Sequence, residues 1–419
     1  MNKTKFFILL LVLVSLVGCK IKQDDNGNGD EPNLVLVSYE KLTAAAITVT
    51  VLDQLLDLDA NFNDKIIQNA TQYAVNVYKV IYNTTYKGVA KQASGACVIP
   101  TASDAVPVVS YQHATILHHS DAPSQYKNLL DMPGEMVMCL LTGACGFVCS
   151  APDYIGYGVD IDTLHPYHHA ESTAVACVDM LRAVKELCAE LDVNTGSEYF
   201  LTGYSEGGYA TLALQKKIET DHAAEFPLSA VSAGAGAYDL LTSSSGFVEY
   251  AALGNPAYVC FIFVAYNDIY GLGRDLNEIF QAPYSDRLRD GLLNGDYTTN
   301  QANSNLTGVT ADLFTAKFLA DFLGSGETTL KDALRDNNLY QGWIPAAPLR
   351  LFHGTADLTV SPANSETAEN AFLNNGAADV EYISFPGLNH AGSVLPWVKN
   401  TIQWFTGSAS ILSFGFEEE

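Results

Sequence analysis

Hydrophobic positions follow two periodicities along the chain, and their order indicates the fold. Short apolar runs, typical of buried strands, alternate with longer segments in which apolar residues recur every three or four positions, as on one face of a helix. Residues 170–189 show the helical pattern most clearly. The predicted buried strands cover residues 106–111, 146–151, 199–202, 228–233, 349–353 and 380–385. Before them, residues 72–83 and 89–99 alternate between apolar and polar positions, which predicts two antiparallel strands.

Two antiparallel strands followed by strand–helix alternation predict an α/β fold, with a mostly parallel central sheet and helices on both faces. Residues 240–346 interrupt the alternation with apolar, helix-like segments. We expect them to form a helical insertion that caps the site, although the same pattern also suits a buttress at the sheet edge. The core is then built from residues 34–239 and 347–419.

The first residues have the features of an export signal. Lys3 and Lys5 precede a twelve-residue apolar run over 6–17, which is too short to span a bilayer. The run ends in Leu16-Val17-Gly18-Cys19, which resembles the lipobox of bacterial lipoproteins. The resemblance implies a signal peptide over 1–18 and a lipidated Cys19, with an ordinary secretory signal as the alternative. The polar, acidic residues after Cys19, up to 33, are predicted to form a flexible tether.

Charge and cysteine content limit the partners and the disulfides that can be expected for the protein. The chain has 47 acidic and 22 basic residues, for a net charge of −25. Such a surface disfavours nucleic acid and anionic lipid headgroups as partners. Besides Cys19 there are seven cysteines, so at least one thiol has no partner within the chain. An exported protein can form disulfides, but the spacing leaves their connectivity open.

One short motif suggests nucleophilic catalysis. Gly203-Tyr204-Ser205-Glu206-Gly207 lies between the apolar run 199–202 and a helical pattern over 208–220. Strand, G-x-S-x-G and helix is the order of a nucleophile elbow, in which the serine hydroxyl is exposed on a tight turn. The alternative is a glycine-rich turn without chemistry. A similar motif over 230–234 lies within an apolar strand and is not expected to be functional.

Two later loops supply partners for the serine. A serine needs a base that is held by a third group. Asp357 follows the predicted strand 349–353, and His390 follows the strand 380–385. Ser205, Asp357 and His390 therefore occur in the chain order of an α/β-hydrolase triad. Asp239, after the strand 228–233, is the second candidate for the acid.

These segments together resemble a known family. GYSEGG, HGTADLTVSP, FPGLNHAG and APDYIGYGVDIDTLHPYHHAESTAVACVDMLRA closely resemble secreted lipases and esterases of the α/β-hydrolase superfamily, in particular the secretory lipase family that includes Candida-type lipase A. The resemblance extends over about residues 73–405. It implies that Ser205 is the nucleophile, that His390 is the general base and acid, and that Asp357 orients the imidazole.

The resemblance also implies an oxyanion hole made of two backbone N–H groups. One belongs to Glu206, directly after the nucleophile. The other comes from the loop after strand 106–111, where relatives usually carry His-Gly-Thr and this chain has His113-Ala114-Thr115. Ala114 departs from the family's glycine at this position, and we expect Thr115 to provide the second N–H. The side chain of Glu206 is expected to line the site rather than act as a second acid.

Histidine-rich stretches raise the question of a metal. His165, His168 and His169 have i, i+3, i+4 spacing, and His118-His119 stand near Asp121. No carboxylate or cysteine pattern completes a metal site, so we expect structural histidines near a helix entry. No cofactor or metal is predicted.

The sequence thus predicts a lipid-anchored, extracytoplasmic lipase or carboxylesterase that forms an acyl-enzyme and takes a small-molecule ester or lipid as substrate. Three alternatives stay open. They are a feruloyl or acetyl esterase acting on polysaccharide, a serine peptidase of the same fold, and a surface lipoprotein that binds a ligand without catalysis.

Overall fold

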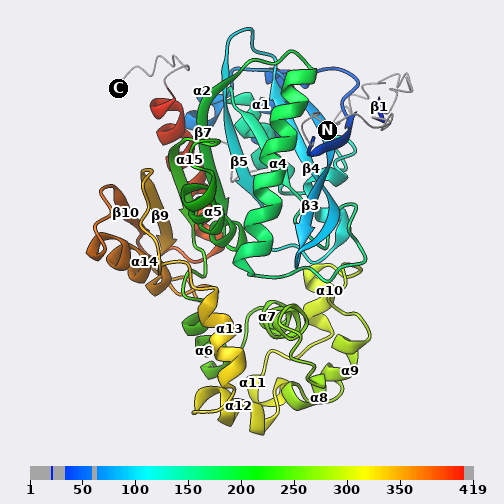
Figure 1. Cartoon of the computed structure of the whole chain (residues 1–419), viewed down its shortest axis with the longest axis vertical. Coiled ribbons are helices and arrows are strands. Elements are labelled where there is room, and N and C mark those ends of the chain that lie inside the picture. The colour runs from blue at the N-terminus through cyan, green and yellow to red at the C-terminus, as the bar shows by residue number, and fades with distance from the viewer. Residues whose placement is uncertain (1–19, 22–33, 59–63, 410–419) are drawn as a thin grey trace, which may run out of the picture.

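The computed structural model describes residues 20–21, 34–58 and 64–409. In this part of the chain ten strands form one sheet, in the order β1-β2-β3-β4-β6-β5-β7-β8-β9-β10 (Figure 1). The run from β6 to β10 is parallel, and β1 to β4 add antiparallel strands at one side. The strands are β1 (Lys20–Ile21), β2 (Leu36–Lys41), β3 (Val75–Tyr86), β4 (Val89–Pro100), β5 (Val106–Gln112), β6 (Val148–Pro152), β7 (Thr195–Tyr204), β8 (Leu228–Gly234), β9 (Leu349–Gly354) and β10 (Val380–Phe385). The predicted α/β class and mostly parallel sheet are confirmed.

Helices cover both faces of the sheet (Figure 1). One face packs against α4 (Ala170–Glu190), α5 (Glu206–Lys217) and α14 (Ala363–Asn374), and the other against α1 (Val49–Leu58), α2 (Lys65–Ala70), α3 (Met136–Ala144) and α15 (Val394–Ser408). A π-helical turn over Ile218–His222 extends α5, and 3₁₀ turns cover His119–Asp121, Pro123–Gln125 and Ala391–Ser393. The two helical layers bury both sides of the strands, which explains why the strands read as continuous apolar runs.

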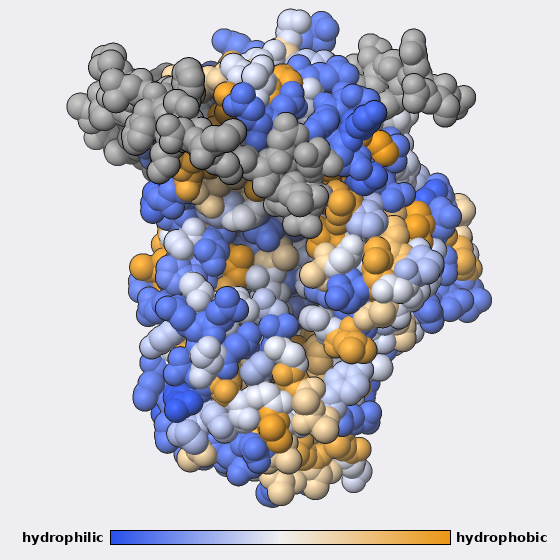
Figure 2. All heavy atoms as spheres, turned by 180° about the vertical axis from the view of Figure 1, so that it is seen from behind, coloured by the Kyte–Doolittle hydropathy of each residue, from blue (hydrophilic) through white to orange (hydrophobic). Residues whose placement is uncertain are grey.

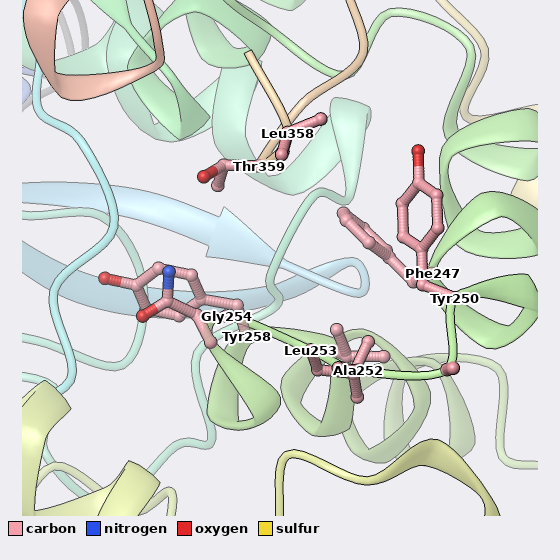
Figure 3. Close-up of a pocket in the computed structure, with 11 residues that line it drawn as sticks. Phe247, Tyr250, Ala252, Leu253, Gly254, Tyr258, Leu358 and Thr359 are labelled. Carbon is pink, nitrogen blue, oxygen red and sulfur yellow. The ribbon is translucent and has the colours of Figure 1, made fainter. Parts of the chain in front are cut away.

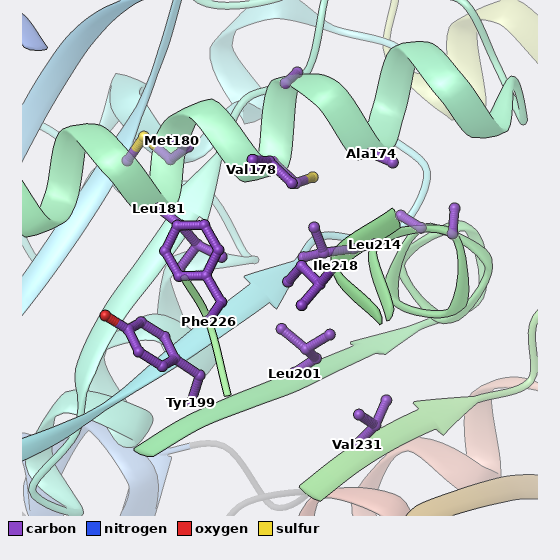
Figure 4. Close-up of a cluster of buried hydrophobic side chains, with 14 of the residues drawn as sticks. Ala174, Val178, Met180, Leu181, Tyr199, Leu201, Leu214, Ile218, Phe226 and Val231 are labelled. Carbon is purple, nitrogen blue, oxygen red and sulfur yellow. The ribbon is translucent and has the colours of Figure 1, made fainter. Parts of the chain in front are cut away.

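Strand β7 is central to this packing. It pairs in parallel with β5 on one side and β8 on the other. Leu201 belongs to the cluster under α4 and α5, whereas Phe200 belongs to the cluster on the opposite face. Figure 4 shows Leu201 of β7 and Val231 of β8 facing the side chains of α4 and Ile218. Burial on both faces fixes the register of β7, because a shift by one residue would exchange the two sets of side chains.

Eight helices lie between β8 and β9 in the described residues and are gathered beyond one end of the sheet, in the lower part of Figure 1. They have a core of their own, rich in phenylalanine. Helix α7 also contacts the loop after β6, where the rings of Tyr167 and Phe261 stack at 4.8 Å and Tyr266 OH donates to His168 O over 2.9 Å. The helices are α6 (Leu240–Glu249), α7 (Pro256–Ile269), α8 (Leu276–Ile279), α9 (Tyr284–Arg289), α10 (Thr299–Ser304), α11 (Thr310–Leu313), α12 (Ala316–Leu323) and α13 (Thr328–Asp336).

The N-terminal predictions lie largely outside the described residues. This applies to the signal peptide, to Cys19 and to residues 22–33 of the expected tether. Lys20 and Ile21, also within that tether, form β1 against β2. Within the described part of the chain, no helix combines the length and the apolar character that crossing a membrane requires.

The described surface is largely hydrophilic, as the acidic composition suggests, and the described cysteines are buried. Figure 2 shows the reverse face of the molecule, where hydrophilic residues surround single hydrophobic residues and small groups of them. The seven cysteines among the described residues are buried as free thiols. They act there as small apolar side chains in the core.

Candidate active site

The turn between β7 and α5 holds Ser205 in a strained conformation. Its backbone has φ 59° and ψ −120°, a region that residues other than glycine seldom occupy. The N–H of Ser205 donates to Gly234 O of the neighbouring strand β8 over 2.8 Å, which anchors the turn to the sheet. Ser205 therefore stands between the carboxyl end of β7 and the first turn of α5. This is the geometry of a nucleophile elbow.

Three glycines make this turn sterically feasible. A Cβ on Gly203 would lie 2.4 Å from Gly207 O, and a Cβ on Gly207 would lie 2.0 Å from Gln112 O. A Cβ on Gly208 would lie 2.2 Å from Gly234 O. All three distances are far inside van der Waals contact, so a larger residue would push α5 away from the strands.

His390 bridges the other two predicted residues. Its Nε2 lies 2.9 Å from Ser205 Oγ, and its Nδ1 lies 2.6 Å from Asp357 Oδ2. The three side chains come from the loops that follow β7, β9 and β10. Tyr204 OH donates to His390 O over 2.6 Å, which fixes the histidine loop against the elbow. The structure thus brings together the three residues that the sequence singled out.

The carboxylate of Asp357 is buried and fully hydrogen-bonded. Its Oδ1 accepts from the N–H groups of Thr359 (2.8 Å) and Val360 (2.9 Å). Its Oδ2 faces His390 and also His353 Nε2, at 3.2 Å. Burial by itself raises the pKa of Asp357, but the hydrogen bonds from the two histidines outweigh it and hold the pKa well below its ordinary value. His353 was not predicted from the sequence, although it lies four residues before Asp357 at the end of β9.

The two predicted oxyanion donors lie at the start of α5 and in the loop after β5. Glu206 is the first residue of α5, where an N–H group has no acceptor within the helix. In the other loop, the N–H of Ala114 donates to Glu135 Oε2 over 3.2 Å, and Thr115 Oγ1 lies 2.9 Å from Tyr167 OH. Among the described residues no acceptor is found for the N–H of Thr115.

Glu135 holds the loop after β5 in place. Besides the Ala114 N–H, its Oε2 accepts a hydrogen bond from Tyr111 OH, near the end of β5. On the other side of the loop, Tyr154 OH donates to His113 O over 3.1 Å. These contacts between distant segments could not be read from the sequence, because nothing in the local pattern pairs residue 135 with residue 114.

The sequence suggested that the side chain of Glu206 lines the site. In the structure this side chain is buried instead. It is 3% exposed, and its Oε1 lies 2.7 Å from Nε2 of His165, which is also 3% exposed. Burial by itself raises the pKa of Glu206, but the nearby histidines, His165 above all, outweigh it and lower the pKa. The partner was visible in the sequence only as one of the histidines of HPYHH.

The remaining histidines have structural contacts. His169 caps α4 by accepting from Ser172 N–H, and His118 caps the first 3₁₀ turn. His168 packs against the rings of Tyr167 and Tyr209, and burial lowers its pKa to about 4. No group of three or more potential ligands that could hold a metal is present within the described ranges.

A cavity of about 370 Å³ lies beside the loop that carries Asp357 (Figure 3). Leu358 and Thr359, directly after the acid, form one wall, and the region of α6 and α7 forms the others. Figure 3 shows the ring of Phe247 pointing into the space between these walls. Burial raises the pKa of Tyr258 in this wall. The lining residues are Phe247, Tyr250, Ala251, Ala252, Leu253, Gly254, Asn255, Tyr258, Val259, Leu358 and Thr359.

Comparisons with solved structures agree with this architecture. A protein of Legionella pneumophila solved as a candidate hydrolase is 26% identical, with a TM-score of 0.80 over 90% of this chain and 99% of that one. The rice cell wall degrading esterase LipA of Xanthomonas oryzae is 24% identical, with a TM-score of 0.76 over 89% and 97% of the two chains. Candida antarctica lipase A is 17% identical, with a TM-score of 0.59 over 77% and 74%. These structures share the α/β-hydrolase fold.

Sequence comparison gives the family. A search of curated proteins found no match. The model of the secretory lipase family, however, matches residues 123–410, which is more than half of the chain and includes Ser205, Asp357 and His390. The chain therefore belongs to the secretory lipase family and is an extracytoplasmic carboxylic ester hydrolase with the α/β-hydrolase fold, acting on ester or lipid substrates.

Proposed function

We propose that this hydrolase cleaves carboxylic esters as a lipase or carboxylesterase, through a Ser205–His390–Asp357 triad and an acyl-enzyme intermediate. The observation that carries the proposal is the continuous series of contacts from Asp357 Oδ2 through both nitrogens of His390 to Ser205 Oγ. A serine hydroxyl becomes a competent nucleophile when a base is held at hydrogen-bond distance by a third group.

In the first half-reaction, Ser205 Oγ attacks the ester carbonyl and His390 Nε2 takes its proton. Asp357 keeps Nδ1 protonated and stabilises the imidazolium that forms. Because the pKa of Asp357 is held well below its ordinary value, the acid stays charged throughout. The developing oxyanion is stabilised by the N–H groups of Glu206 and Thr115.

The first half-reaction ends when the protonated His390 gives its proton to the departing alcohol as the ester C–O bond breaks, which leaves the acyl group on Ser205 and begins the second half. A water molecule then attacks the acyl-enzyme while His390 again acts as the base, and the acid product leaves with Ser205 regenerated. The partial positive charge at the N-terminus of α5 lies next to the oxyanion and stabilises it in both halves.

We further propose that residues 240–346 form a cap and that the cavity beside Asp357 binds the acyl chain. The separate phenylalanine-rich core of α6–α13 and its contacts with the loop after β6 support the first point. The mainly apolar lining of the cavity, next to the acid, supports the second. Each CH₂ that moves from water into such a cavity contributes about 0.8 kcal/mol to binding.

An ester attached to polysaccharide is the second candidate substrate. Tyr250 and Tyr258 line the cavity, and tyrosine rings suit both sugar faces and aromatic acyl groups. The similar esterase of Xanthomonas oryzae is named for degrading rice cell wall. A feruloyl or acetyl ester of a plant glycan would therefore fit the same catalytic residues.

Replacing Ser205 by alanine tests the nucleophile. Ser205→Ala is expected to lower kcat for p-nitrophenyl esters by about 10⁶-fold, because the acyl-enzyme cannot form. Ser232→Ala, in the similar motif of β8, is the matched control and is expected to leave kcat unchanged, since the Ser232 hydroxyl is hydrogen-bonded to Thr401 and Trp397 in the core. Esters from acetyl to palmitoyl, and a feruloyl ester, are compared in the same assay. Wild-type enzyme that cleaves none of them would direct attention to peptide or pure binding activity.

Asp357 and Asp239 compete for the role of the acid, and their amides separate them. Asp357→Asn is expected to lower kcat by about 10⁴-fold, because His390 loses the carboxylate that sets its tautomer. Asp239→Asn is expected to change kcat by less than about threefold, since Asp239 caps α6 and bonds Asn338 and Tyr340. A larger loss in the Asp239 variant, with both proteins folded by circular dichroism, would reverse the assignment.

Filling the cavity tests the acyl site. Ala252 is exposed to the cavity, so Ala252→Trp should occupy it without disturbing the core. We expect kcat/KM to fall at least about tenfold for a decanoyl ester and less than about threefold for an acetyl ester, because only the long chain loses buried contacts. Val89→Trp, at an exposed position on β4, is the control. Equal losses for both esters would place the acyl chain elsewhere.

We propose that Cys19 is lipidated and anchors the enzyme to a membrane. In a bacterial host, the full chain should incorporate labelled palmitate and enter the detergent phase, whereas Cys19→Ala should do neither, because the acyl chains supply the membrane affinity. Ser205→Ala in the full chain is the control and must still be labelled, which excludes a label held as acyl-enzyme. Labelling of the Cys19 variant would disprove the anchor.

A further inference from the structure

The buried side chains of Glu206 and His165 lie directly beside the nucleophile but have no part in the mechanism above. His165 Nε2 lies 2.7 Å from Glu206 Oε1, and His165 Nδ1 lies 2.7 Å from Ile155 O. The pair thus connects the first residue of α5 to the loop that follows β6. It links two segments that are 41 residues apart in the sequence.

The hydrogen-bond partners set the number of protons in the pair. A backbone carbonyl can only accept, and so can an ionised carboxylate. A neutral imidazole has one N–H, which would leave its second nitrogen facing an acceptor at 2.7 Å with no proton between them. The pair therefore holds two protons, one between His165 Nδ1 and Ile155 O and one between His165 Nε2 and Glu206 Oε1, and has no net charge.

The surroundings exclude water from this pair. The ring of His165 packs among the rings of Tyr154, Tyr157, Tyr167 and Phe261, with centroid separations of 4.9 to 6.1 Å. In such a site water cannot take the place of a lost partner. Removal of either side chain therefore leaves a buried polar group without its hydrogen bond. The contact geometry is accordingly well defined.

We propose that Glu206 and His165 are positioning residues for acyl transfer: their contact fixes the first peptide of α5 so that the N–H of Glu206 points at the oxyanion. This inference rests on the proposed Ser205 mechanism and adds to it the group that orients one oxyanion donor. The peptide of residue 206 is the link, because the same residue carries the donor on its backbone and the anchor on its side chain.

The position of the pair next to the oxyanion also requires that the pair carry no net charge. An unpaired carboxylate next to the oxyanion would repel it in a site of low dielectric constant. His165 cancels that charge while leaving the N-terminal dipole of α5 to act on the oxyanion. A second buried carboxylate can therefore stand one residue from the nucleophile without opposing the reaction.

Three substitutions of Glu206 separate position from charge. Gln at this site can donate its amide N–H to His165 Nε2 while His165 Nδ1–H donates to Ile155 O, so Glu206→Gln keeps both contacts without the charge. Glu206→Asp keeps the charge but is one CH₂ too short to reach His165. Glu206→Ala removes both. Glu225→Ala, which breaks the Arg182–Glu225 ion pair before β8, is the control for a lost ion pair at the amino end of that strand, away from the elbow.

The readouts are kcat and KM for a p-nitrophenyl ester and the rate at which a fluorophosphonate probe labels the serine. We expect Glu206→Ala and Glu206→Asp to lower kcat and the labelling rate at least about tenfold with KM within about twofold, because a misplaced donor weakens only the transition state. Glu206→Gln should recover to within about threefold of the wild type. Glu225→Ala should label at the wild-type rate.

Different results would overturn different claims. Wild-type enzyme that is not labelled, or Ser205→Ala that is labelled, contradicts the proposed nucleophile. The positioning role alone is overturned if Ser205 is labelled and Glu206→Asp is labelled as fast as the wild type. The same holds if Ser205 is labelled and Glu206→Gln is labelled as slowly as Glu206→Asp. If thermal unfolding shows that Glu206→Ala does not fold, the comparison of the Asp and Gln variants decides.

Discussion

The close approach of three backbone segments at the elbow is the constraint on which the rest of the site depends. Ser205 has a positive φ, and its N–H is bonded to Gly234 O. Gly207 packs against Gln112 O at a distance that excludes any Cβ. This packing requires that β5, β7 and β8 be adjacent and parallel, because only then do their carboxyl ends meet around the same turn. The parallel sheet and its two helical layers provide that adjacency.

Two buried carboxylates near this turn are stabilised in the same way. Asp357 is held by His353 and His390, and Glu206 is held by His165. In each case burial opposes the charge and the histidines more than compensate, so both carboxyl pKa values are lowered. The difference lies in exposure: His390 is open toward Ser205, whereas His165 is enclosed by aromatic rings. In the proposed mechanism, the pair with His390 therefore exchanges protons with the substrate, and the enclosed pair holds a position.

The helical segment between β8 and β9 places apolar side chains beside the loop that carries the polar Asp357. Its phenylalanine-rich core makes it a separate packing unit, and α7 joins it to the loop after β6. The cavity lies at the junction of this segment with Leu358 and Thr359, immediately after the acid. In the proposed function, substrate selection and catalysis are therefore adjacent in space although they belong to different parts of the chain, which allows one to vary without the other.

The sequence by itself determined the order of strands and helices, the elbow motif and the loops of Asp357 and His390, because these depend on local periodicity and turn chemistry. Strand β10 was predicted with its observed bounds, and α4 within one residue. Only the tertiary structure decided that Glu135 holds Ala114, that His353 supports the acid and that Glu206 is buried against His165. Those contacts join segments far apart in sequence, where side-chain direction and burial, rather than local pattern, select the partner.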